Sequence, residues 1–130
     1  MTYLKLFLIA TPVFFLIDML WLGVVAKNMY NKYLGYLMGD INWVAAIIFY
    51  LLFNAALVYF VLAPAVAHGS WTRLLFAAAF FGFITYATYD LTNLATIRDW
   101  PFMITLIDIV WGTVLAMLVS GISFYIYKLV

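Results

Sequence analysis

Four long apolar runs, separated by short polar stretches, dominate the pattern of the chain. A helix that crosses the hydrocarbon core needs about 20 mostly apolar residues. Four stretches reach that length: residues 5–26, 41–63, 71–95 and 101–127. The pattern therefore predicts an all-α fold, an integral membrane four-helix bundle, with residues 1–130 forming one transmembrane domain. We expect the first run to be a retained spanning helix, because it is too long for a signal-peptide core and contains Asp18.

Polar and proline residues mark the expected ends of these helices. Asp40, Ser70 and Asp99 stand where N-caps belong, because a side-chain oxygen there can accept a free backbone N–H. Pro101 falls in the expected first turn of the fourth helix, where a missing N–H costs little. Pro64 predicts the end of the second helix, since proline interrupts a helix interior.

The connections predict how the helices follow one another. The longest one carries Tyr and Leu at helical spacing, which predicts a short amphipathic segment over about residues 28–38 at the headgroup level, or an extension of the first helix into water. The other connections are tight turns, so the last three helices should be antiparallel neighbours. Lys and Arg divide three to three between the two sides, which leaves the orientation open and keeps dual topology and a homodimer as alternatives.

Composition restricts the partners of the chain. Hydrophobic residues make up 70% of it and charged residues 8%, against roughly 25% charged in a soluble domain. Membrane lipid is therefore the expected surrounding. The chain has no cysteine and a single histidine, so neither a disulfide framework nor a thiolate or His-rich metal site is expected. A net charge of +1 provides no basic surface for nucleic acid.

Three aspartates lie within the expected spanning helices. An aspartate at the centre of a membrane helix costs roughly 2.5–3.5 kcal/mol, so Asp18, Asp90 and Asp108 should face the bundle interior. At 1.5 Å per residue they lie about 12, 8 and 10 Å from the ends of their helices on one side of the membrane. The sequence therefore predicts that the three carboxylates share a polar pocket in one half of the bilayer.

Other residues are expected to line or close this pocket. Tyr86, Asp90 and Asn93 share a face of the third helix, and Arg98 is the nearest candidate counter-ion. The full set of candidate binding residues is Asp18, Asp90, Asp108, Asn93, Tyr86, Tyr89, Trp21, Trp111, Arg98 and Asn54. Three further tryptophans at expected helix starts are interpreted as interfacial anchors: Trp43, Trp71 and Trp100.

Two sequence patterns concern the packing of the first and fourth helices. Asp108, Gly112, Ala116 and Ser120 follow each other at four-residue steps, a small-residue ladder that lets another helix approach closely, with Ala78 and Gly82 as a counterpart. The phrase L-I-D-x-x-W occurs at residues 16–21 and again at 106–111. Because Asp and Trp three apart share a helical face, each repeat places an indole beside a carboxylate.

These phrases also carry a family resemblance. Residues 18–23 (D-x-x-W-L-G), residues 87–96 (A-T-Y-D-L-T-N-L-A-T), Trp100-Pro101 and residues 108–113 (D-x-x-W-G-T) resemble a bacterial membrane family known as domain-of-unknown-function family 2177. The likeness covers nearly the whole chain. It implies a small four-helix, multi-pass protein of the bacterial inner membrane, and it implies no activity, substrate or site.

The carboxylates leave three functions open. The first is a pocket that binds a small molecule, cation or proton, with proton-coupled transport as its extension. The second is an intramembrane enzyme that acts on a lipid or isoprenoid, with one Asp as acid and another as base. The third is a structural or lipid-organising subunit in which the acids form interhelical hydrogen bonds. No catalytic residue is assigned and no cofactor is predicted, although a divalent cation at the carboxylates is compatible with oxygen ligands.

Overall fold

The computed structural model describes all residues, 1–130, as helices joined by short connections and contains no strand. In chain order the elements are α1 (Thr2–Leu20), the π-helical segment η1 (Trp21–Val25), α2 (Lys27–Leu34), α3 (Trp43–Leu57), the π-helical segment η2 (Val58–Leu62), α4 (Ala63–His68), α5 (Trp71–Thr96) and α6 (Phe102–Leu129). The fold is therefore all-α, as the sequence predicts.

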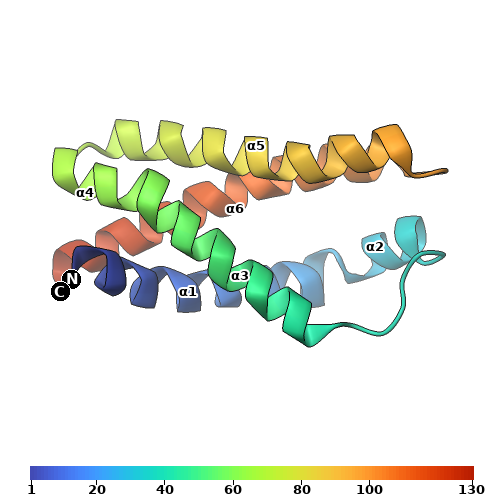
Figure 1. The fold of residues 1–130 in the computed structure, drawn as a ribbon, viewed down its shortest axis with the longest axis horizontal. Coiled ribbons are helices and arrows are strands. Elements are labelled where there is room, and N and C mark those ends of the chain that lie inside the picture. The colour runs from blue at the N-terminus through green and yellow to red at the C-terminus, as the bar shows by residue number, and fades with distance from the viewer.

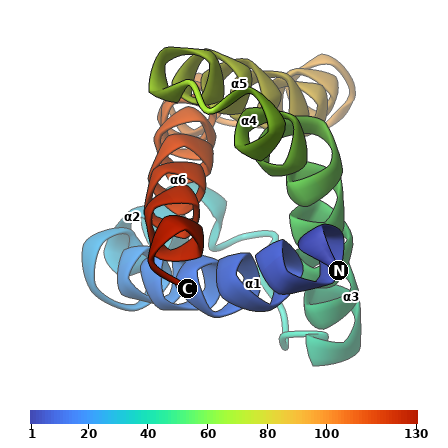
Figure 2. The same ribbon diagram turned by 90° about the vertical axis from the view of Figure 1, so that its left-hand side faces the viewer.

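Four continuous helical stretches are long and apolar enough to cross a membrane: Thr2–Val25, Trp43–His68, Trp71–Thr96 and Phe102–Leu129. Viewed end-on, α5, α6, α1 and the second span form the four sides of the bundle (Figure 2). Both termini and the turn between α4 and α5 lie at one end, which we call the terminal end (Figure 1). At the opposite, loop end lie α2, the connection to α3 and the turn between α5 and α6.

The second span continues past the proline that was expected to end it. Pro64 lies at the start of α4, and the helix runs on to His68. Directly before it, η2 widens the helix by one residue per turn, with the N–H of Ala63 bonded to the carbonyl of Val58. A wider turn displaces the backbone hydrogen bonds that a proline would otherwise break. The π-helical segment thus accommodates the ring, and the predicted stop at residue 63 is wrong.

Two of the three predicted N-caps are also wrong. Ser70 caps α5 by accepting the N–H of Arg73 at 3.2 Å. For α3 the cap is Asn42, which accepts the N–H of Ala45, and the expected Asp40 lies in the exposed loop before it. Asp99 has a positive φ of 61° and reverses the chain before α6. The amphipathic segment is shorter than expected, because α2 ends at Leu34 and a turn follows.

The closest helix contact is between α5 and α6, and glycine makes it possible. A Cβ added at Gly82 would collide with the carbonyl oxygen of Gly112 and lie 2.7 Å from the Cβ of Ala116. Ala78, Ala116 and Ser120 are completely buried in the same contact region. The predicted small-residue ladder and its counterpart on the third span are confirmed.

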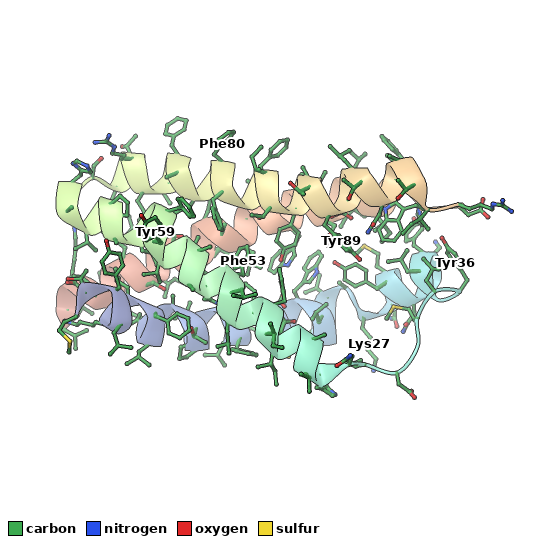
Figure 3. The ribbon with its side chains drawn as sticks, in the orientation of Figure 1. Lys27, Tyr36, Phe53, Tyr59, Phe80 and Tyr89 are labelled. Carbon is green, nitrogen blue, oxygen red and sulfur yellow. The ribbon has the colours of Figure 1, made fainter.

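The apolar core fills the terminal half of the bundle. Its largest completely buried members come from every span: Leu6, Phe14, Leu57, Leu62, Leu74, Leu115, Val119 and Phe124. Large apolar side chains on the outside point away from the other helices, as Phe80 does on α5 (Figure 3). Such a surface suits lipid, in which exposed apolar groups carry no hydration cost. The terminal half therefore holds most of the buried apolar side chains.

Candidate functional site

A cavity of about 380 Å³ opens in the loop half, between α1, α2, α3, α5 and α6. The structure brings the three aspartates of the long helices to its wall: Asp18 from α1, Asp90 from α5 and Asp108 from α6. Aromatic rings form most of the remaining lining: Trp21, Tyr30, Phe49, Tyr50, Tyr86, Tyr89, Trp100 and Trp111. We call this space the central cavity.

The two repeated Asp-x-x-Trp phrases meet face to face. The indoles of Trp21 and Trp111 stack with their centroids 4.3 Å apart and their planes 7° from parallel. Offset stacking of aromatic rings contributes about 0.5–1.5 kcal/mol beyond burial. Since each Trp lies three residues after an Asp, the stack fixes the positions of Asp18 and Asp108 on adjacent helices.

Tyr30 connects this stack to a carboxylate. Its hydroxyl accepts a hydrogen bond from Nε1 of Trp21 at 3.2 Å and donates one to Oδ1 of Asp108 at 2.8 Å. Burial first, and the nearby charge of Asp108 second, raise the pKa of the Tyr30 hydroxyl well above its usual range. The phenol therefore stays protonated and remains a donor to Asp108. Sequence analysis missed this role, because Tyr30 comes from the short helix that was expected to lie at the headgroups.

Asp90 is buried beside the carboxyl of Asp108. Its side chain is completely inaccessible, and neither carboxylate oxygen accepts a hydrogen bond. The Nε1 of Trp111, in the same cavity wall, is likewise buried and unpaired. An unpaired buried carboxylate costs several kcal/mol if it is charged, so Asp90 needs either a proton or an external cation.

Three of the predicted pocket residues lie elsewhere. Arg98 is exposed in the turn between α5 and α6 and does not line the cavity, so it is not the counter-ion that the sequence suggested. Asn93 is half-buried outside the cavity lining. Asn54 is completely buried in α3, where Nδ2 donates to the carbonyl oxygen of Tyr50 at 2.8 Å, and it does not form the cavity floor. The positive φ of Asp99 explains the position of Arg98, because the chain turns outward there.

Trp100 belongs to the site although it was expected to be an interfacial anchor. Its side chain is 7% exposed, and its Nε1 donates to Oγ1 of Thr105 at 3.1 Å. Trp43 and Trp71, the other two expected anchors, are 55% and 40% exposed. The buried bond to Thr105 turns the Trp100 indole toward the cavity, and the five-residue separation gives no periodic signal that the sequence could reveal.

The loop end of the cavity is covered by α2 and the turn after it. Leu34 and Met38 line the cavity from this side. The hydroxyl of Tyr36 donates to the backbone carbonyl of Asp99 at 2.7 Å, which ties the α2 turn to the α5–α6 turn. Figure 3 shows Tyr36 at this end of the molecule, next to the end of α2. The cover therefore rests on a specific contact between two loops.

The cavity contains no group of three His, Cys, Asp or Glu side chains that could hold one metal ion. Its carboxyls come from three helices, and no Lys, Arg or His side chain lines it. The arrangement thus presents the neighbouring carboxyls of Asp90 and Asp108, together with Asp18, to whatever occupies the cavity.

Comparison with known proteins shows the family of the chain. Neither a curated protein nor a solved structure matches it. A family described as predicted membrane protein (DUF2177) matches residues 3–125, which cover most of all four spans and every aspartate that lines the cavity. The four-span all-α fold agrees with that description. The chain belongs to this family of multi-pass membrane proteins, DUF2177.

Proposed function

We propose that the central cavity binds a small organic cation, such as a protonated or quaternary amine, in exchange for protons on its carboxylates. One observation carries this proposal: Asp18, Asp90 and Asp108 line one cavity that contains no positively charged side chain. Carboxylates at membrane depth need a charge partner, and a bound cation or a proton can each fill that need. We further propose, on the basis of the family resemblance, that the protein acts in the bacterial inner membrane.

The aromatic lining favours an organic cation over a metal ion. The faces of Trp and Tyr attract cations within about 6 Å, and cages of such rings bind quaternary ammonium groups. The three carboxyls come from three helices and form no compact three-ligand cluster, which favours a guest of several atoms. The volume, about 380 Å³, lies in the lower part of the roughly 300–1,000 Å³ usual for ligand pockets.

The alternatives have less support. A purely structural role requires acids that are satisfied by neighbouring helices, whereas Asp90 accepts no hydrogen bond and has another carboxyl, that of Asp108, as its neighbour. Transport in this state would require a path through the terminal half, which is filled by buried Leu, Val and Phe side chains. Proton-coupled transport therefore needs a second conformation. A transporter and a simple binding protein would both bind the cation in exchange for protons, so the proposal is limited to that step.

The test is equilibrium binding of tetramethylammonium to the purified protein in lipid nanodiscs. The chain has five acids, all aspartates, and offers matched controls, because Asp40 and Asp99 are exposed and outside the cavity. We expect Asp18→Asn, Asp90→Asn and Asp108→Asn each to weaken binding roughly tenfold to a hundredfold, about 1.4–2.8 kcal/mol. Asp40→Asn and Asp99→Asn should leave it unchanged. Absence of binding to the wild type, or equal losses in all five variants, would overturn the proposal.

A further inference from the structure

A second opening leads from the outer surface of the bundle to Asp108. It has a volume of about 330 Å³ and is lined by Phe49, Thr85, Tyr86, Tyr89 and Asp108. Four of these residues also line the central cavity, all except Thr85. The two spaces therefore share a wall, and the outer one lies between α3 and α5. We call it the lateral opening.

The lateral opening exists because α3 diverges from α5. Helix α5 contacts the second span through η2 and α4, near the terminal end. Toward the loop end α3 runs away from α5 and crosses in front of α1 (Figure 1). Phe49 on α3 and Tyr89 on α5 remain 49% and 57% exposed on the two sides of the gap. Large aromatic side chains thus flank a space that no other part of the chain fills.

The depth of this opening puts it within the hydrocarbon. Helix α5 has 26 residues and is about 39 Å long at 1.5 Å per residue, whereas the hydrocarbon core is about 30 Å thick. Thr85 lies 11 residues before the end of α5 at Thr96, about 17 Å from that end by the same rise. The opening therefore faces acyl chains. Water, in contrast, meets α2 and its turn, which cover the loop end of the cavity.

We infer that the ligand is an amphiphile, with one cationic ammonium head in the central cavity and a hydrocarbon chain that leaves between α3 and α5. This inference rests on the binding function proposed above and adds the chemical class of the ligand. Three carboxylates and the Trp21–Trp111 stack supply the surroundings of the head. The ring of Phe49 and the aromatic rings of α5 supply contacts for the hydrocarbon chain of the ligand. A ligand of this shape is dissolved in the bilayer and reaches the cavity without crossing the cover.

The test compares a cation with and without a chain in nanodiscs. Dodecyltrimethylammonium and unlabelled tetramethylammonium each compete with radiolabelled tetramethylammonium. The variant Thr85→Trp fills the lateral opening, and Thr88→Trp is its control, because Thr88 is exposed on α5 and lines no described cavity. We expect Thr85→Trp to weaken the binding of the dodecyl compound about tenfold or more and to leave the affinity for tetramethylammonium unchanged. Thr88→Trp should change neither affinity. Because each ligand is compared with itself across variants, the effect of its partitioning into lipid cancels.

The outcomes separate the two proposals. If tetramethylammonium does not bind the wild type, the binding function itself is wrong. If it binds but the dodecyl compound is unaffected by Thr85→Trp, or equally affected by Thr88→Trp, the amphiphile inference is wrong and the cation site remains. Should Thr85→Trp fail to fold, photocrosslinking of the wild type decides. A trimethylammonium amphiphile with a diazirine in its chain should label peptides of α3 and α5 that contain Phe49 and Thr85, and labelling of other faces would overturn the inference.

Discussion

At the scale of single residues, the hydroxyl of Tyr30 makes two hydrogen bonds to side chains of other helical segments. It joins the indole of Trp21 to the carboxylate of Asp108. We predict that Tyr30→Phe lowers the free energy of unfolding by about 1–3 kcal/mol, because a hydrogen bond to a charged group is lost and an indole donor is left unpaired. Thermal unfolding in detergent measures the change. Tyr125→Phe, at a residue that is 56% exposed on α6, is the control; equal shifts for both variants would contradict the role of Tyr30.

The ionisation of Tyr30 gives a prediction about pH. The raised pKa means that the folded state favours the neutral phenol. Its contribution to stability is therefore present below the ordinary tyrosine pKa of about 10 and is lost only as the pH rises through the higher folded value. At about pH 11, one unit above the ordinary value, the phenolate absorbance of wild type and Tyr30→Phe should be the same in the folded state. If Tyr30 instead ionised at the ordinary tyrosine pKa, the wild type would show more phenolate absorbance than Tyr30→Phe, and this would contradict the prediction.

Residue chemistry also explains which parts of the site could be predicted. Because aspartate is costly in lipid, the sequence alone predicted that Asp18, Asp90 and Asp108 face the bundle interior. In the structure all three line one cavity. Tyr30 and Trp100 escaped prediction, because their positions depend on how α2 and the α5–α6 turn fold back over the bundle. Arg98 was misplaced since one left-handed residue, Asp99, redirects the chain. Local turns, unlike helix faces, leave no periodic signal.

At the scale of helices, the contact between α5 and α6 depends on the absence of a side chain at Gly82. We predict that Gly82→Ala lowers the free energy of unfolding by about 1–3 kcal/mol, the usual cost of overpacking, because the added Cβ would collide with backbone of α6. On α6 itself, Gly121→Ala is the control, since its Cβ would meet only Trp71 at an ordinary 3.8 Å. It should be neutral or stabilising by up to about 1 kcal/mol. Chemical or thermal unfolding of both variants in one detergent measures the difference. A Gly82→Ala variant with unchanged stability would contradict the close approach of α5 and α6.

The helices themselves were largely predictable from apolar length, whereas their irregularities were not. All four spans follow from runs of hydrophobic residues that exceed the thickness of the hydrocarbon core. The π-helical segments η1 and η2 have no distinct composition, and η2 lets the second span pass Pro64. A rule that treats proline as a stop fails where a wider turn precedes it, because the hydrogen bond that proline would break is already displaced.

At the scale of the whole molecule, the two halves of the bundle differ in what fills them. The terminal half is packed with apolar side chains, and the loop half contains the cavity. Since the chain has no cysteine, single cysteines report on access without background. We predict that Ala46→Cys, in the cavity lining, reacts with a small cationic thiol reagent, and that the buried core variant Ala65→Cys stays unmodified. Tetramethylammonium should slow only the first reaction; comparable labelling of both would contradict the division into halves.

The central claim is that cavity carboxylates exchange protons for an organic cation, and proton release on binding tests it most directly. Calorimetric titration of tetramethylammonium into the protein, repeated in buffers of different ionisation enthalpy, counts the protons released. The account predicts release by the wild type and by Asp40→Asn, with affinity that rises as pH rises and protons compete less. Release should be reduced in Asp18→Asn and Asp90→Asn. Binding without proton release, or release that these two substitutions leave unchanged, would contradict the account.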